Sequence, residues 1–264
     1  MNHLFPISHY VFNRGLLFGK WKVICIKSQP NFSANLIESN MKNIILLLVC
    51  TFLFSADEKA PSQRTRDREV DIHHIKIDVT VDLQQKSVSG NVTHTLSAFN
   101  SSLSEFELDA EDMEIHRVRL NGKDISYNHH GEKVFLSLNK PIGWDDTIKV
   151  RLDYTAHPRR GTFFIAPDSV YPGKPWQAWT QGEDTDNHHW VPIYDYPNDK
   201  ATFETILTVD KKFLAISNGE LLSIKENKDG TDTWHWYEHF PMVSYLISYV
   251  VGEFEKVEDS YNGI

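Results

Sequence analysis

The sequence predicts an all-β fold: a large, twisted antiparallel β-sandwich or saddle-shaped domain that follows a non-globular leader. Apolar and polar residues alternate with a period of two in most segments after residue 69, which is the period of a half-buried strand. Short turn sequences separate these segments. No segment shows a sustained apolar stripe with the 3.6-residue period of a helix, so the domain is predicted to be nearly all β.

The alternating segments are predicted to be strands with one face in the core. In the first of them, Ile75, Ile77, Val79 and Val81 face one side and charged or polar residues face the other. The later predicted strands contain Val88–Leu96, Phe106–Leu108, Val134–Leu138, Ile148–Tyr154 and Ala201–Val209. Turns are predicted at Asn121-Gly122, His130-Gly131 and Pro141–Asp146. The run Val243–Val251 is apolar on both faces apart from its serines, which predicts a strand buried on both sides.

The first 68 residues are predicted to lie outside the β domain. Residues 41–56 have a short basic start, an apolar stretch and a small-residue exit, as a secretory signal peptide does. Residues 1–40 are then an over-extended leader, 57–68 a polar linker, and 69–264 the β domain. The apolar stretch is shorter than the roughly 20 residues that span a bilayer, so no stable membrane span is predicted and the protein is expected to be exported, to a periplasmic or extracellular location. A buried internal strand or an uncleaved anchor are the alternatives for residues 41–56.

The charge and the cysteines exclude other classes of protein. The chain has 27 Lys and Arg against 36 Asp and Glu, a formal net charge of −9. This sign argues against nucleic-acid binding, which needs basic patches for phosphate contacts. The two cysteines, Cys25 and Cys50, both lie in the predicted leader. The β domain therefore has no disulfide framework and no thiolate metal ligand.

The most informative segment is Trp176–Phe203, which is rich in aromatic and proline residues and fits neither a helix nor a strand period. Its ordered motif consists of Gln181, Glu183, Pro192, Asp195, Pro197 and Lys200. This motif resembles that of the amino-terminal domain of the aminopeptidase N family of zinc exopeptidases, which includes the leukotriene hydrolase branch. Leu214–Gly219 and Phe240–Phe254 resemble two further family segments in the expected order. The resemblance covers roughly residues 66–264, and it implies a β domain that lies before a zinc-bearing catalytic domain.

The resemblance assigns substrate binding to Gln181 and Glu183. An exopeptidase must recognise the free ammonium group of its peptide, and a fixed carboxylate in a partly dry pocket does this well. By resemblance, Glu183 binds the α-ammonium and Gln181 lines the pocket for the first side chain. Without the surrounding motif, both would be interpreted as ordinary polar residues of a surface loop.

No metal ligand and no catalytic residue is predicted in this chain. The helical His-Glu-x-x-His sequence that binds zinc in such enzymes is absent. Three pairs of adjacent histidines, His73-His74, His129-His130 and His188-His189, are predicted to be surface or packing residues, because adjacent side chains on a strand diverge. The family commonly has two arginines at the third pair. The cofactor prediction is thus none for this chain, and zinc for the intact family enzyme.

The other residues of the motif segment are predicted to be structural. Asp195 and Pro197 suit a rigid turn in which the carboxylate caps backbone amides. Three large rings, Trp176, Trp179 and Trp190, are predicted to lie in the core.

The predicted function is substrate recognition in an exported zinc aminopeptidase that acts on peptides with a free amino terminus. The catalytic domain is expected to be the missing partner, and the chain alone is expected to be inactive. An epoxide hydrolase of the leukotriene branch has the same domain, so that reaction stays open for the parent protein. The alternative from another class is a stand-alone β-sandwich module that binds peptides or glycans.

Overall fold

The computed structural model describes His9–Phe12, Val23–Ile26 and residues 65–257. The chain divides into two units, residues 1–63 and residues 64–264. In the first unit, β1 (His9–Phe12) pairs antiparallel with β2 (Val23–Ile26). The predicted signal peptide at residues 41–56 lies outside the described residues. No helix in the described part of the chain is long and apolar enough to cross a bilayer.

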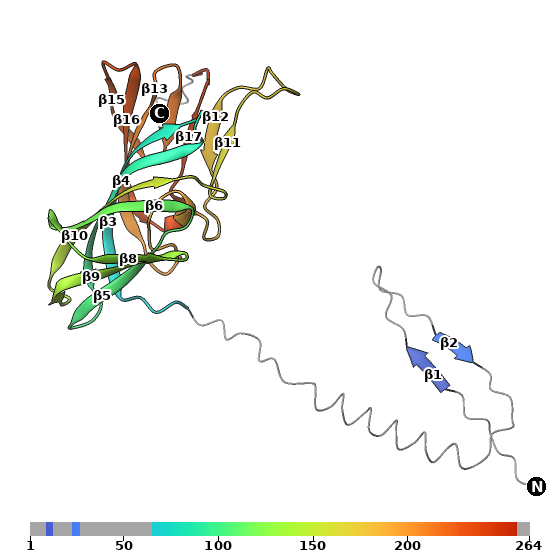
Figure 1. Cartoon of the computed structure of the whole chain (residues 1–264), viewed down its shortest axis with the longest axis horizontal. Helices are drawn as coiled ribbons and strands as arrows, with labels where there is room; N and C mark the ends of the chain where they lie inside the picture. The colour runs from blue at the N-terminus through green and yellow to red at the C-terminus, as the bar shows by residue number, and fades with distance from the viewer. Residues whose placement is uncertain (1–8, 13–22, 27–64, 258–264) are drawn as a thin grey trace, which may run out of the picture. The chain divides into compact units, whose positions relative to one another are not determined.

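The second unit consists of three β-sheets, as Figure 1 shows. The eight-stranded sheet has the order β15 (Glu220–Glu226), β16 (Thr231–Met242), β13 (Ala201–Asp210), β3 (Val70–Asp82), β4 (Ser87–Ala98), β10 (Thr147–Ala156), β6 (Met113–Leu120), β7 (Lys123–Asp124). The three-stranded sheet has the order β5 (Leu103–Asp109), β9 (Lys133–Ile142), β8 (Tyr127–His130). The four-stranded sheet has the order β11 (Thr162–Ile165), β12 (Gln177–Thr180), β17 (Tyr249–Gly252), β14 (Leu214–Ser217). The predicted all-β class is confirmed.

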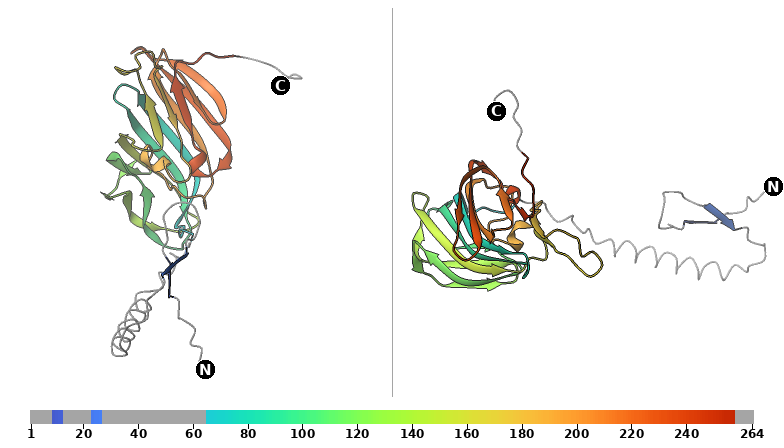
Figure 2. Two further views of the ribbon diagram at one scale, coloured as in Figure 1. Left: turned by 90° about the vertical axis from the view of Figure 1, so that its right-hand side faces the viewer. Right: turned by 90° about the horizontal axis from the view of Figure 1, so that it is seen from above.

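The strands pair antiparallel throughout this unit except for β13 and β3, which are parallel. Strands β3 and β4 extend across the domain between its two ends, which Figure 2 shows in cyan between the green and the orange-red strands. The predicted alternation is present: Ile75, Ile77, Val79 and Val81 of β3 are all buried. Such a row of branched side chains on one pleated face contributes about 1.5–3 kcal/mol of burial free energy for each residue.

Two of the predicted turns have the backbone conformation that their residues allow. Asn121 and Gly122 have φ angles of 48° and 83° and join β6 to β7, as in a tight hairpin turn with two left-handed residues. Gly131, with φ 62°, lies between β8 and β9. Local sequence was therefore sufficient to predict these connections.

The end of the predicted linker is held against the domain by two arginines. Arg68 donates to Asp199 Oδ1 at 2.9 Å, and its guanidinium lies 4.1 Å from the ring centre of Phe99. Arg66 pairs with Asp109 and, at 2.9 Å, with Glu107. The folded unit thus includes residues 65–68, because charge-assisted bonds to buried and half-buried carboxylates fix them.

The predicted strand over Val243–Val251 is wrong in its first half. Ser244–Leu246 form the 3-10 helix η2, and only Tyr249–Gly252 are a strand. The carbonyl oxygens of Ser244 and Ile247 accept hydrogen bonds from the side chain of Asn187. A remote amide therefore takes the acceptors that a strand would use in its ladder.

A buried histidine in β4 makes the stability of this domain depend on pH. His94 is fully buried, and its Nε2 donates to the Pro192 carbonyl at 2.9 Å. Burial lowers the pKa of His94 to about 4, although that hydrogen bond acts in the opposite direction. Protonation of His94 is therefore less favourable in the folded state than in the unfolded state. The contribution of neutral His94 to the free energy of unfolding is fully present above about pH 6.5 and is lost as the pH falls toward 4.

We expect His94 to account for about 2 kcal/mol of lost stability between pH 7 and pH 5. Urea unfolding at both values should show this decline in the wild type and a smaller decline in His94→Gln, whose amide can still donate to Pro192. Equal pH dependence in the two proteins would contradict a neutral buried imidazole.

Candidate functional site

The predicted recognition residues follow β12 directly. The backbone N–H of Gln181 donates to the Gly161 carbonyl at 2.9 Å, which ties the end of β12 to the turn before β11. Thr180 Oγ1 accepts from the Tyr249 N–H at 2.9 Å. The loop thus leaves the four-stranded sheet at a point that two neighbouring strands fix.

Two glycines let the loop pack closely against its surroundings. A Cβ on Gly182 would lie 2.5 Å from Asn187 Oδ1, and a Cβ on Gly161 would overlap the Asp186 carbonyl oxygen. The Asp186 N–H also donates to the Gly182 carbonyl at 2.9 Å. Residues 182–186 therefore form a compact turn, and its position depends on the absence of a Cβ atom at Gly161 and at Gly182.

Buried Asn187 anchors the end of this turn. Its Nδ2 donates to the Ser244 carbonyl at 2.7 Å and to the Ile247 carbonyl at 3.0 Å, and its Oδ1 accepts from Trp190 Nε1 at 2.8 Å. Such a fully satisfied buried amide is a rigid link, because any displacement leaves polar groups unpaired.

On this rigid base, the side chains of Gln181 and Glu183 are both exposed. Within residues 65–257, no hydrogen bond or ion pair involves either side chain. The peptide bond between Glu183 and Asp184 is cis. With no partner among the described residues, the Glu183 carboxylate is free to bind a cationic group. Its assignment to a substrate ammonium stays a prediction.

The structural role predicted for Asp195 is confirmed. Its side chain is buried, and it accepts hydrogen bonds from the N–H and Nδ1 of His188 and from Ser244 Oγ. The Asp195 N–H in turn donates to Asp109 Oδ2 at 2.9 Å. The segment after the turn is thereby fixed to β5.

The three tryptophans of the motif segment differ in burial. Trp190 is fully buried, as predicted, and Trp176 is half-buried against the core. The prediction is wrong for Trp179, which is 36% exposed and stacks on Phe163 with ring centres 4.7 Å apart. Strand β12 faces the core on only one side, so its alternate residues face solvent.

An apolar row crosses the exposed face of the four-stranded sheet. The registers of its strands place Phe163 beside Trp179, Trp179 beside Val250, and Val250 beside Ile216. Phe163 and Ile216 are 40% and 47% exposed. A contiguous apolar row of this kind is typical of a surface that another protein surface covers. Trp179, a member of this row, lies two residues before Gln181.

The first two histidine pairs behave as predicted. His73 and His74 contact the hydroxyl groups of Ser97 and Thr202, and His129 Nε2 contacts the Ala110 carbonyl at 2.9 Å. Each of these three rings contacts a different protein group. None of them shares a ligand position with its neighbour.

The third pair also consists of packing residues, but it does not lie on a strand as expected. His188 and His189 lie on the 3-10 helix η1 (Asn187–His189), and their rings stack with centres 4.5 Å apart. The Nε2 atom of each ring lies 3.8 Å from Glu111 Oε2. This group is the one set of residues in the described part of the chain whose side chains could together hold a metal ion.

Carboxylates surround this histidine pair. Burial opposes the charged form of His188, but its hydrogen bond to Asp195 and the charges of Asp195, Asp109 and Glu111 outweigh burial and raise its pKa. The sequence reasoning missed the group because Glu111 follows β5, far from the motif in the chain. It also assumed that adjacent histidines lie on a strand, where their side chains diverge.

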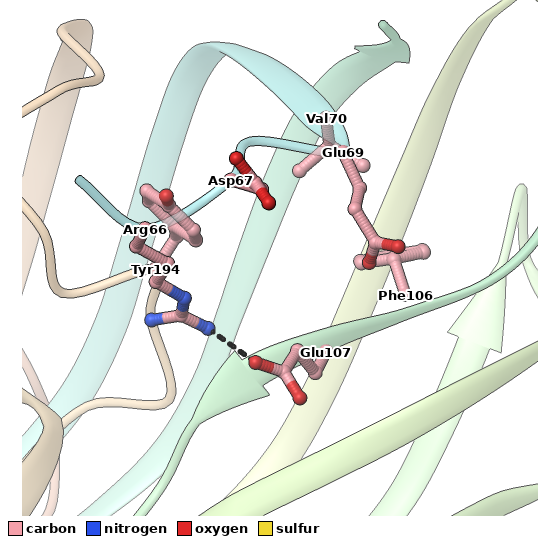
Figure 3. Close-up of a pocket in the computed structure, with 7 residues that line it drawn as sticks. All are labelled: Arg66, Asp67, Glu69, Val70, Phe106, Glu107 and Tyr194. Atoms are coloured by element: carbon pink, nitrogen blue, oxygen red, sulfur yellow. Dashed lines mark hydrogen bonds and ion pairs between the residues drawn. The ribbon is translucent and has the colours of Figure 1, made fainter. Parts of the chain in front are cut away.

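A pocket of about 250 Å³ lies where the chain enters the domain (Figure 3). Its lining includes Arg66, which pairs with Glu107 and lies 4.3 Å from the centre of the Tyr194 ring. Neither Gln181 nor Glu183 lines this pocket. Internal ion pairs satisfy Arg66, so the contacts here anchor the chain.

Comparisons with known proteins agree with this architecture. Residues 71–246 match the Peptidase M1 N-terminal domain family. "Probable aminopeptidase 1" of Saccharolobus solfataricus is 31% identical over 161 residues, which are 61% of this chain and 20% of that protein. Leukotriene A-4 hydrolase of Xenopus laevis is 23% identical over 207 residues, which are 74% of this chain and 34% of that protein.

A solved structure has the same fold. An M1 zinc metallopeptidase mutant from Deinococcus radiodurans, solved with a bound Tyr-Ser-Ala substrate, superposes with a TM-score of 0.62 at 25% identity, over 70% of this chain and 43% of that one. The chain spans about a fifth and a third of the length of the two curated relatives. Its sequence, its sheets and these matches together place it: the chain belongs to the Peptidase M1 N-terminal domain family.

Proposed function

We propose that this chain is the substrate-recognition part of an exported zinc aminopeptidase, and that Glu183 binds the α-ammonium group of the peptide. The observation that carries the proposal is an exposed carboxylate without a protein partner among residues 65–257, on a turn that Gly161, Gly182 and Asn187 hold in place. Preorganisation of this kind strengthens a charge-assisted contact, because little entropy is lost on binding. Gln181 lies beside it and offers an amide to the first residue of the substrate.

The zinc that activates water in such enzymes polarises the scissile carbonyl when it is bound. The histidine pair of η1 does not fit that centre. His188 and His189 are adjacent on η1 rather than one helical turn apart. We therefore propose that the catalytic zinc is held by another domain and that residues 65–257 alone do not hydrolyse peptides. Turnover of leucine-anilide by the purified chain would contradict this.

The apolar row of Phe163, Trp179, Val250 and Ile216 supports a partner for this surface. We propose that the catalytic domain covers it. This arrangement would bring the turn that carries Glu183 next to the catalytic cleft, since Trp179 of the row lies shortly before the turn in the chain.

The recognition role is tested by titrating the full chain with tri-alanine and following backbone amide signals by NMR. We expect the signals of residues 181–186 to shift with a dissociation constant in the millimolar range, because the chain supplies only part of the site. N-acetyl-tri-alanine, which lacks the ammonium group, should cause no shift there. Glu183→Gln should weaken binding about tenfold, the loss of roughly 1.4 kcal/mol.

The matched control is Asp184→Asn, which removes the neighbouring exposed carboxylate and should leave the titration nearly unchanged. An unchanged titration in Glu183→Gln would contradict the proposal. Micromolar binding by the wild-type chain would instead favour the stand-alone peptide-binding module. Export is tested separately by mass spectrometry of the mature amino terminus, which we expect near residue 57.

A further inference from the structure

We propose that Glu111, His188 and His189 form a binding site for one zinc ion, which joins the connection between β5 and β6 to η1. This inference is independent of the recognition role of Glu183. The sequence predicted no metal ligand in this chain, and the proposal replaces that expectation.

The first observation is the orientation of the two imidazole rings. His188 Nδ1 lies 3.0 Å from Asp195 Oδ2, and His189 Nδ1 lies 2.9 Å from Asp112 Oδ2. In each neutral ring, the nitrogen that faces a carboxylate carries the proton, so Nε2 presents its lone pair. A carboxylate behind the histidine is the usual arrangement for a metal-bound imidazole, because it fixes the tautomer and the ring direction.

The second observation is the convergence of the free donor atoms. Both Nε2 atoms lie 3.8 Å from Glu111 Oε2. A tetrahedral zinc ion with bonds of about 2.0–2.1 Å requires donor separations of roughly 3.3 Å. Side-chain movements of a few tenths of an ångström would bring both Nε2–Oε2 distances to this value. The backbone already holds the two segments together, since the Glu111 N–H donates to the His188 carbonyl at 3.0 Å.

The other carboxylate oxygen of Glu111 is occupied. Arg159 donates from its guanidinium to Glu111 Oε1 at 3.0 Å, which directs Oε2 toward the histidines. A fourth oxygen is close by, because Asp186 Oδ1 lies 3.9 Å from His189 Nε2. The site could thus complete its coordination with Asp186 or with water.

The charges around this position also favour a bound cation. The carboxylates of Glu111, Asp112, Asp186 and Asp195 surround the site, and the guanidinium groups of Arg159 and Arg160 balance two of the four. With neutral imidazoles, two lone pairs and a carboxylate face one another across less than 4 Å without a cation between them. A divalent ion supplies the two missing charges at the point where the donors meet.

The ligand types suit zinc, and the site is accessible from solution. Two imidazoles and one carboxylate match a common zinc donor set, whereas magnesium and calcium prefer oxygen alone. The side chains of Glu111 and His188 are 23% and 14% exposed. An ion can therefore enter from the surface while His189 stays buried. Bound zinc would stiffen η1, which follows the turn of Glu183 by a few residues.

The test uses the full chain with Cys25→Ser and Cys50→Ser, which removes its two thiols. We expect this protein, incubated with zinc at pH 7.5 and desalted, to retain one zinc ion by elemental analysis. Calorimetric titration should give a dissociation constant in the micromolar range or lower. Zinc should also raise the melting temperature, because it binds only the folded state.

Three variants define the ligands. Glu111→Gln, at a half-buried position, should weaken zinc binding at least tenfold without unfolding the protein, and His189→Gln should abolish it. Asp112→Asn should weaken binding about 10–100-fold through the ring that it orients. His73→Gln alters another adjacent pair and should bind zinc as the parent does. Circular dichroism checks that each variant is folded.

A nitrogen NMR experiment separates zinc from protonation. With zinc bound, Nδ1 of both rings should carry a proton and Nε2 should not. The proposal is overturned if the parent retains no zinc, if Glu111→Gln and His189→Gln bind it equally well, or if all four ring nitrogens stay protonated at pH 7.5 in the presence of zinc.

Discussion

Replacing Trp190 by alanine should lower the free energy of unfolding by about 3–5 kcal/mol. The indole is fully buried and meets the Tyr249 ring edge-on, with ring centres 5.1 Å apart. It also donates to Asn187 Oδ1. The substitution therefore leaves a cavity and removes one hydrogen bond from the amide that anchors residues 182–186, the recognition turn. Urea unfolding followed by circular dichroism measures the loss.

Trp179 is the matched control for this substitution. It has the same side chain, in the same segment, but is 36% exposed and has Phe163 as its stacking partner. Trp179→Ala should therefore cost less than about 1.5 kcal/mol, mostly through that ring contact. If the two substitutions cost the same, the assignment of Trp190 to the core and Trp179 to the surface is wrong.

The second large effect is expected at Gly161. Its φ angle is 73°, and an added Cβ would overlap the Asp186 carbonyl oxygen at the end of the recognition turn. Gly161→Ala should lower stability by about 2–4 kcal/mol, because left-handed strain and a backbone clash combine. It should also displace the turn and abolish the shifts that tri-alanine causes at residues 181–186.

Gly131 separates strain from the clash. Its φ angle is 62°, close to that of Gly161, but a Cβ there would meet nothing within 4 Å. Gly131→Ala should cost only about 1 kcal/mol and leave peptide binding unchanged. A Gly161→Ala protein with the stability and peptide titration of Gly131→Ala would show that the turn does not depend on this close approach.

The strands and hairpins could be predicted because their signals are local. In β3, alternation of apolar and polar residues is sufficient to define which side faces the core, since successive side chains of a strand point in opposite directions. The Asn121-Gly122 turn was predictable for a similar reason, because these residues adopt positive φ angles easily. Gln181 and Glu183 were found only through the ordered motif around them, since two polar residues of a loop have no pattern of their own.

Two of the errors have a common physical cause. The run Val243–Val251 has the composition of a buried strand, but the side chain of Asn187 binds two carbonyl groups in its first half and holds η2 in place. Glu111 meets His188 and His189 because β5 ends beside the motif segment, where Asp109 and Ile193 form a bridge. In each case the partner comes from a distant part of the chain.

The sequence by itself determined the β class of this protein, the course of most strands, the family and the two candidate recognition residues, because periodicity, turn chemistry and motif order are properties of neighbouring residues. Only the tertiary structure decided which tryptophan is buried, which carboxylates orient the histidine pair, and how two glycines and one asparagine hold the recognition turn. Those outcomes depend on strand register and on packing between remote segments, and neither can be derived from short-range patterns.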